Sequence, residues 1–141
     1  AKVDLDIFFA CVLAGGNRTL RRKARQSMSL PGLIRFAWDR IQMGRTASVR
    51  IVGMREARPA VLAHAADVES RLTRDFLFGD TPCHADFSAY HGLWFIRELA
   101  ESTLLKDFPR LNAWMDRMRA FGDGRPQPLD AREALAIARA A

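Results

Sequence analysis

The chain has 141 residues, of which 49% are hydrophobic and 9% aromatic, a composition typical of one globular domain rather than a disordered segment. No apolar stretch is long enough to span a membrane, and acidic rather than basic residues precede the first apolar run, which excludes an ordinary secretory signal. Together with two cysteines that match no zinc or redox spacing, this predicts a soluble cytoplasmic protein with no membrane partner.

The net charge of +6 is concentrated in one segment. Residues 17–58 carry eleven basic side chains and two acidic ones, so this segment is +9 and the remainder is −3. Such asymmetry indicates a possible anionic partner. Four of the arginines recur at helical spacing: Arg18, Arg21, Arg22 and Arg25. They are interpreted as a solvated polar face, as contacts to an acidic partner or, least favoured because no stacking platform or recognition motif accompanies them, as a nucleic-acid surface.

The first apolar run, from Asp4 to Leu13, predicts a well-buried helix. The pair Gly15 and Gly16 after it predicts a stop or a kink, because each glycine costs a helix about 1 kcal/mol relative to alanine. The basic stretch 18–26 either resumes the helix or forms a connection.

Pro31 suits the first turn of a second helix. We expect Gly44 to weaken or end this helix. Residues 46–54 are rich in β-branched side chains, but a lone strand would have no partner in this chain, so we expect no strand there. The apolar residues of the second helix fall at helical spacing on one side: Leu33, Ile34, Ala37, Trp38 and Ile41.

Three more helices are expected in the rest of the chain before its last segment. Pro59 is expected to open a helix that runs to about residue 74. A helix from residue 83 or 84 to about residue 99 is apolar nearly all round, which marks it as the central helix. Another helix starts at Pro109 and ends near residue 121. Its buried face is expected to consist of Leu111, Trp114, Met115 and Met118.

Two prolines break the chain before Asp130, which is expected to cap a last short helix at 131–141 with Leu135 and Ile137 facing inward. No internal repeat or linker divides the chain. The sequence therefore predicts an all-α fold, a single-domain bundle of five or six helices over residues 1–141.

Asp86 and Cys83 stand at the start of the central helix. In a capping box, a side chain at the cap and a carboxylate three residues later satisfy two backbone amides reciprocally. Asp86 supplies the carboxylate, whereas the thiol of Cys83 is a weak acceptor, so that Thr81 could substitute from a shifted register. We interpret Cys83 and Asp86 as structural cap residues, with Cys83 a small buried residue rather than a reactive thiol.

Several segments together resemble one protein family. Residues 78–87 (FGDTPCHADF) closely resemble the G-x-x-P-T-x-A-D helix start in the all-helical C-terminal domain of glutathione transferases. Residues 69–79 resemble the run that precedes that turn in the family, and residues 107–114 (DFPRLNAW) are similar to its y-P-x-l-x-x-W helix start. Residues 121–138 resemble an ending seen in bacterial members. These matches follow the family's order.

The resemblance implies the C-terminal domain of a glutathione-transferase-like protein, which contributes a hydrophobic-substrate pocket and dimer contacts. In that family the glutathione thiol site belongs to a preceding thioredoxin-like domain, for which this chain has no room. The resemblance therefore implies no catalytic residue and no cofactor in this chain. It implies an enzyme, with glutathione as co-substrate, only if a thioredoxin-like domain precedes Ala1, and we expect such a domain and a homodimer.

By the same analogy, the first two helices face the missing domain and line the substrate pocket. The arginines would then contact an acidic partner or the carboxylates of glutathione. The alternative for the pocket residues is ordinary core packing. The candidates for the pocket are Phe8, Phe9, Val12 and Trp38.

Other chemistry is not favoured by the sequence. His84 and His91 share a helix but lie about 10 Å apart, too far to bind one ion without help, so we expect no metal site. Tyr90 does not inherit the family's thiol-activating role, because that residue belongs to the absent domain. The alternative function is a stand-alone protein–protein, or weakly nucleic-acid-binding, interaction module that uses the aromatic surface and the arginines of 17–58.

Overall fold

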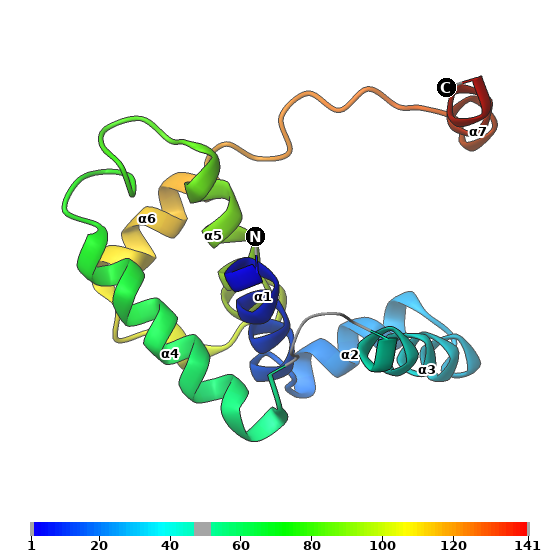
Figure 1. The fold of residues 1–141 in the computed structure, drawn as a ribbon, viewed down its shortest axis with the longest axis horizontal. Helices are drawn as coiled ribbons and strands as arrows, with labels where there is room; N and C mark the ends of the chain where they lie inside the picture. The colour runs from blue at the N-terminus through cyan, green and yellow to red at the C-terminus, as the bar shows by residue number, and fades with distance from the viewer. Residues whose placement is uncertain (1, 47–51, 141) are drawn as a thin grey trace.

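The computed structural model describes residues 2–46 and 52–140, which form helices joined by turns and extended segments (Figure 1). The α-helices are α1 (Lys2–Ala14), α2 (Arg18–Ser27), α3 (Leu30–Thr46), α4 (Met54–Arg71), α5 (His84–Trp94), α6 (Pro109–Arg119) and α7 (Ala131–Ala140). A π-helical turn, η1 (Phe95–Leu99), continues α5, and a 3₁₀ turn, η2 (Thr103–Leu105), precedes α6. The all-α fold is confirmed, with seven α-helices in the described part of the chain instead of five or six. Most of residues 46–54, for which we expected no strand, lie outside the described residues.

Four helices, α1, α4, α5 and α6, form the body of the molecule together with η1 and η2 (Figure 1). Their apolar faces meet in one core because each helix carries apolar residues at helical spacing. The predicted face of α6 is confirmed, since all four of its residues are buried. The largest fully buried apolar side chains are Trp114, Leu93, Ile96, Leu105, Leu111, Met115 and Val61.

Two carboxylates hold the starts of α5 and α6. Asp86, which is fully buried, accepts hydrogen bonds of 2.9 Å from the backbone N–H of Leu77, the backbone N–H of Cys83 and the indole N–H of Trp114. Burial alone would raise the pKa of Asp86, but these bonds outweigh it and lower the pKa below its ordinary value of 3.8. Asp86 therefore joins the cap of α5, the preceding loop and the core of α6.

Glu69 of α4 caps the start of α6. Its carboxylate accepts from the backbone N–H of Leu111 at 2.6 Å and from that of Arg110 at 3.2 Å, two groups that have no partner within their own helix. Burial opposes ionisation of Glu69, yet these bonds prevail and lower its pKa below the ordinary 4.5. The sequence does not indicate this cap, because it joins residues more than forty positions apart.

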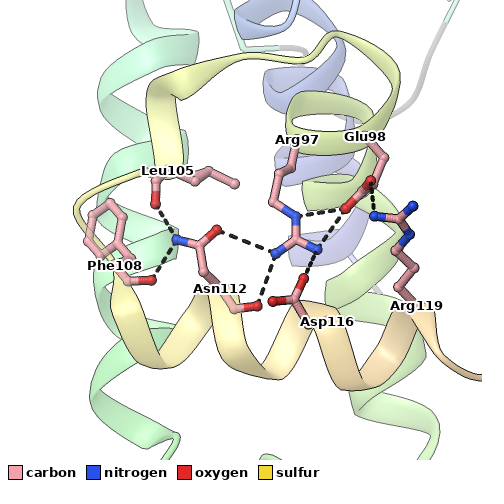
Figure 2. A network of polar contacts seen from close by, with 7 residues as sticks. All are labelled: Arg97, Glu98, Leu105, Phe108, Asn112, Asp116 and Arg119. Atoms are coloured by element: carbon pink, nitrogen blue, oxygen red, sulfur yellow. Dashed lines mark hydrogen bonds and ion pairs between the residues drawn. The ribbon is translucent and has the colours of Figure 1, made fainter.

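Arg97 ties the π-helical turn to α6, as Figure 2 shows. Its guanidinium donates to the Asn112 backbone carbonyl at 2.9 Å and to the carboxylates of Asp116 and Glu98 at 2.7 Å each. The Asn112 side chain in turn donates to the carbonyls of Leu105 (2.7 Å) and Phe108 (2.8 Å). The network therefore gives the Leu105 and Phe108 carbonyls a second donor besides the backbone N–H groups of Phe108 and Asn112, and it holds η1 against α6.

Several helix boundaries differ from the sequence prediction. Pro59 does not open a helix: α4 starts at Met54 and includes Pro59 in its second turn. A proline near a helix start removes only one backbone hydrogen bond, and the buried side chains of Ala57 and Val61 anchor the helix on both sides of it. Likewise α3 continues past Gly44 to Thr46.

The prediction for the last helix is right about its cap and wrong about its packing. Asp130 accepts from the backbone N–H of Arg132 at 2.6 Å. Leu135 and Ile137, which were expected to face inward, are each 57% exposed, because α7 lies apart from the body at the end of an extended segment (Figure 1). Gly122 and Gly124 adopt left-handed conformations in the segment that leads the chain away from α6.

The helices α2 and α3 form a hairpin beside the body rather than part of the core (Figure 1). Asn17 is the N-cap of α2, after the break that follows α1, and its side-chain oxygen accepts from the Leu20 backbone N–H at 2.9 Å. Its side-chain amide donates to the Ala100 carbonyl at 2.7 Å. Lys23 adds a bond to the Leu99 carbonyl and an ion pair with Glu101. These contacts fix α2 to the end of η1.

Candidate functional site

A cleft of about 690 Å³ lies between α1, α4, α5 and the loop before α5. Its volume is within the range of pockets that bind small organic molecules. We call it the α1–α4–α5 cleft. Its apolar lining consists of Ile7, Phe8, Val68, Leu77, Phe78, Ala85, Ala89 and Gly92.

Gly92 makes the close approach of α1 to α5 possible at the floor of this cleft. A Cβ atom at position 92 would lie 3.3 Å from the sulfur of Cys11 and 3.9 Å from the Cα of Phe8. An added Cβ atom would require the Cys11 side chain to give way by a few tenths of an ångström. A glycine within an otherwise apolar helix is the sequence signal for such an approach.

The polar residues of the cleft come from α4 and α5. Asp67 and Arg71 form an ion pair of 2.9 Å, and Ser88 lies further along α5. Three histidines, His64, His84 and His91, also line the cleft, although the sequence analysis considered only the last two together. In the described ranges, no group of three or more His, Cys, Asp or Glu side chains is arranged to hold a metal ion.

The structure separates the four predicted pocket residues. Phe8 lines the α1–α4–α5 cleft, where its ring contacts the rings of His91 (5.0 Å between centroids) and Phe95 (5.2 Å). Phe9 packs edge-to-face on Phe8 but does not line the cleft, and neither does Val12; both are half-buried. Trp38 lies on the exposed side of α3, in a separate shallow groove.

The four predicted arginines lie together on one side of α2. At 100° per residue, Arg18, Arg21, Arg22 and Arg25 fall within about 100° of the helix circumference. They line an open groove of about 660 Å³ that Leu33 of α3 closes on the other side. We call these four residues the arginine face.

The two cysteines differ in environment, and both are unpaired. Cys11 is fully buried, and its burial raises the pKa of its thiol to about 12, so it is neutral and unreactive at physiological pH. Cys83 stands at the N-cap of α5, as the sequence predicts, with Asp86 accepting from its backbone N–H. Tyr90 packs edge-to-face on Trp114 and does not line the cleft.

Comparison with known proteins relates part of the body of the molecule to one family. Residues 54–121 match the family model of the glutathione S-transferase C-terminal domain. This part of the chain is similar to a glutathione S-transferase C-terminal domain. No curated protein and no solved structure matches the chain significantly. No helix in the described ranges is long and apolar enough to cross a membrane.

The matched segment contains α4, α5, η1, η2 and α6, and therefore both helix starts that Asp86 and Glu69 cap. It supplies two of the three helices of the cleft. The third, α1, precedes the matched residues and packs on α4 and α5. The α2–α3 hairpin and α7 lie outside the match.

Proposed function

We propose that the α1–α4–α5 cleft forms the apolar wall of a substrate site in a glutathione-transferase-like protein, with α1 acting as part of the same domain. The observation that carries this proposal is the cleft itself: about 690 Å³ with an apolar floor and polar residues from α4 and α5. An apolar molecule bound there would bury its surface against Phe8 and Phe78, while the histidines could donate hydrogen bonds to its polar groups.

In this proposal the chain binds and positions one of two reactants. Thiol addition or thiol–disulfide chemistry is accelerated by lowering the pKa of the thiol and by holding the two substrates together. A thioredoxin-like partner domain would supply the thiol site, with glutathione as co-substrate, and the cleft would hold the apolar electrophile. The proposal includes a homodimer, the usual assembly of two-domain glutathione transferases.

The test measures binding of a neutral apolar dye, such as Nile red, to the chain and its displacement by a neutral electrophile such as 1-chloro-2,4-dinitrobenzene. A neutral probe is chosen because an anionic one would also bind the arginine face. Phe8→Ala is expected to weaken dye binding by at least about fivefold through loss of apolar contact. Phe9→Ala is the matched control, because Phe9 is adjacent and half-buried but does not line the cleft.

A second variant tests the cleft without removing apolar contacts. Ala85→Leu adds volume to the lining from α5 and is expected to reduce dye binding while the far-UV circular dichroism spectrum stays unchanged. Equal effects of Phe8→Ala and Phe9→Ala, or unchanged binding in Ala85→Leu, would overturn the proposal. Retention of the chain on immobilised glutathione would contradict the assignment of the thiol site to another domain.

A further inference from the structure

The α2–α3 hairpin exposes apolar and basic surfaces that the substrate proposal does not use. On α3, four large apolar side chains recur at intervals of four, four and three residues and are 55–64% exposed. At 100° per residue they fall within about 80° of the helix circumference. We call them the α3 stripe: Leu30, Ile34, Trp38 and Ile41.

The arginine face of α2 points away from the body. Lys23, on the opposite side of α2, donates to the Leu99 carbonyl and pairs with Glu101 at 2.6 Å, so that side is the one attached to the body. In the part of the chain that the structure describes, none of the four arginines of the face forms an ion pair. Arg22 acts electrostatically on Glu101, whereas the charges of Arg18, Arg21 and Arg25 are available to a partner.

The two surfaces adjoin. The groove of about 660 Å³ between the helices has the arginine face on one side and Leu33 on the other. Leu33, which lines this groove, precedes Ile34 of the α3 stripe. The basic groove and the apolar stripe are therefore neighbours on the circumference of α3. Arg35 and Arg40 flank the stripe, one on each side, and both are exposed. The hairpin thus combines an apolar ridge with basic margins.

We propose that this hairpin binds the surface of an anionic lipid membrane, with the α3 stripe inserted at the boundary of headgroups and acyl chains and the arginines against lipid phosphates. An amphipathic helix with Trp and Leu on one face and arginines beside it is the usual form of an interfacial membrane anchor. Charge complementarity selects an anionic surface: residues 17–46 contain eight basic side chains and one carboxylate, a net charge of +7.

Two further observations favour lipid over other occupants. A second copy of the hairpin would bring two charges of +7 together. A nucleic acid would need aromatic rings interleaved with the arginines, whereas Phe36 lies on another side of α3 from Trp38, with the Arg40 guanidinium 5.2 Å from its ring centroid. An interfacial helix need not span the bilayer, so the prediction of no membrane partner, which depended on the lack of a spanning segment, does not apply to it.

The test is co-sedimentation of the full 141-residue chain with vesicles. Binding is expected to mixed phosphatidylglycerol–phosphatidylcholine vesicles, to be at least about tenfold weaker with pure phosphatidylcholine, and to fall in high salt. Trp38 fluorescence is expected to shift to shorter wavelength on binding, and the shift is expected to vanish in Trp38→Phe, since Trp114 is buried and Trp94 half-buried.

Matched variants on α3 and α7 test whether vesicle binding requires the hairpin surface or any exposed apolar residue. Ile34→Glu on α3 and Ile137→Glu on α7 place the same charge at residues that are 64% and 57% exposed. Only Ile34→Glu is expected to abolish sedimentation. The double variant Arg21→Gln with Arg25→Gln is expected to weaken binding by about fivefold for each arginine, whereas the exposed α7 pair Arg132 and Arg139, changed in the same way, serves as the control.

Three results would overturn the proposal. The first is equal binding to neutral and anionic vesicles, and the second is equal loss in Ile34→Glu and Ile137→Glu. The third is binding to a soluble partner instead, seen either as a dimer in light scattering that Ile34→Glu dissociates or as binding to polyglutamate or single-stranded RNA without binding to vesicles. Because the α1–α4–α5 cleft uses none of these residues, failure here leaves the substrate proposal standing.

Discussion

The body of the molecule and its two appendages, the α2–α3 hairpin and α7, use apolar residues in opposite ways. In the body, Leu93, Ile96 and Leu111 are fully buried against neighbouring helices. In the appendages, Ile34 and Ile137 lie on equally regular helices and are more than half exposed. The family match covers only residues of the body. The comparison shows that helical periodicity predicts which residues share a face, but not whether a partner covers that face.

The sharpest test of this comparison changes one helix cap in each region. Asp86→Ala removes the acceptor for two backbone N–H groups and for the buried indole of Trp114. We expect the free energy of unfolding to fall by about 3–5 kcal/mol, because buried donors lose their partner. Denaturant unfolding, followed by circular dichroism, measures it.

The matched change is Asp130→Ala at the cap of α7. It removes the bond to the Arg132 backbone N–H but is expected to change global unfolding by less than about 0.5 kcal/mol, because α7 contributes no residue to the core. Similar losses in the two variants would mean that α7 is part of the cooperative unit, contrary to the comparison.

The second test concerns arginines. Arg97→Ala breaks the network of Figure 2, in which the arginine side chain is only 16% exposed, and we expect a loss of about 2 kcal/mol. Arg40→Ala removes an exposed ion pair with Asp39 on α3, which is expected to contribute less than about 0.5 kcal/mol. Thermal unfolding of both variants measures the two losses of stability. A larger loss in Arg40→Ala than in Arg97→Ala would show that the hairpin supports the fold.

The smallest expected effect depends on pH. Asp86 and Glu69 have folded-state pKa values below their ordinary 3.8 and 4.5, so the stability that they contribute is complete above those values. It is lost as the pH falls through the lowered pKa values. We therefore expect the free energy of unfolding to decrease as acid is added below about pH 4.5.

Glu69→Gln is expected to cost about 1 kcal/mol at neutral pH, and the difference from the unmodified chain should shrink in acid. Glu133→Gln, in the first turn of α7, is the control. It should change the free energy of unfolding neither at neutral pH nor in acid. Urea midpoints measured from pH 7 to pH 3 provide the comparison. A difference for Glu69→Gln that persists unchanged at low pH would show that the cap does not require the charged carboxylate.

Much of the body could be predicted from sequence because its determinants are local. The apolar spacing of α6 predicted its buried face, and Asp86 three residues after Cys83 predicted the start of α5. The longer-range contacts could not be predicted: the second role of Asp86, its bond to the Trp114 indole, depends on α6 lying beside α5. Neither could the cap that Glu69 provides for α6.

The candidate site was predictable only in part, for the same reason. Both Phe8 and Trp38 were predicted to line the pocket because they are large and apolar. The structure places Phe8 in the α1–α4–α5 cleft and Trp38 on the surface of the hairpin. Helix spacing placed Arg18 and Arg25 on one face, but whether that face meets solvent depends on where Lys23 attaches α2. The position of His64 in the cleft follows only from the packing of α4 against α5.

Gly92 restricts how the proposed substrate cleft could change its ligand preference. It lines the cleft and also contacts Cys11, so a side chain there would change the shape of the cleft and displace the Cys11 side chain at the same time. Selectivity can change at lower risk at Phe78 and Ala85, which line the cleft away from that contact. Variation among related proteins should therefore be concentrated at such outer positions, with position 92 held constant.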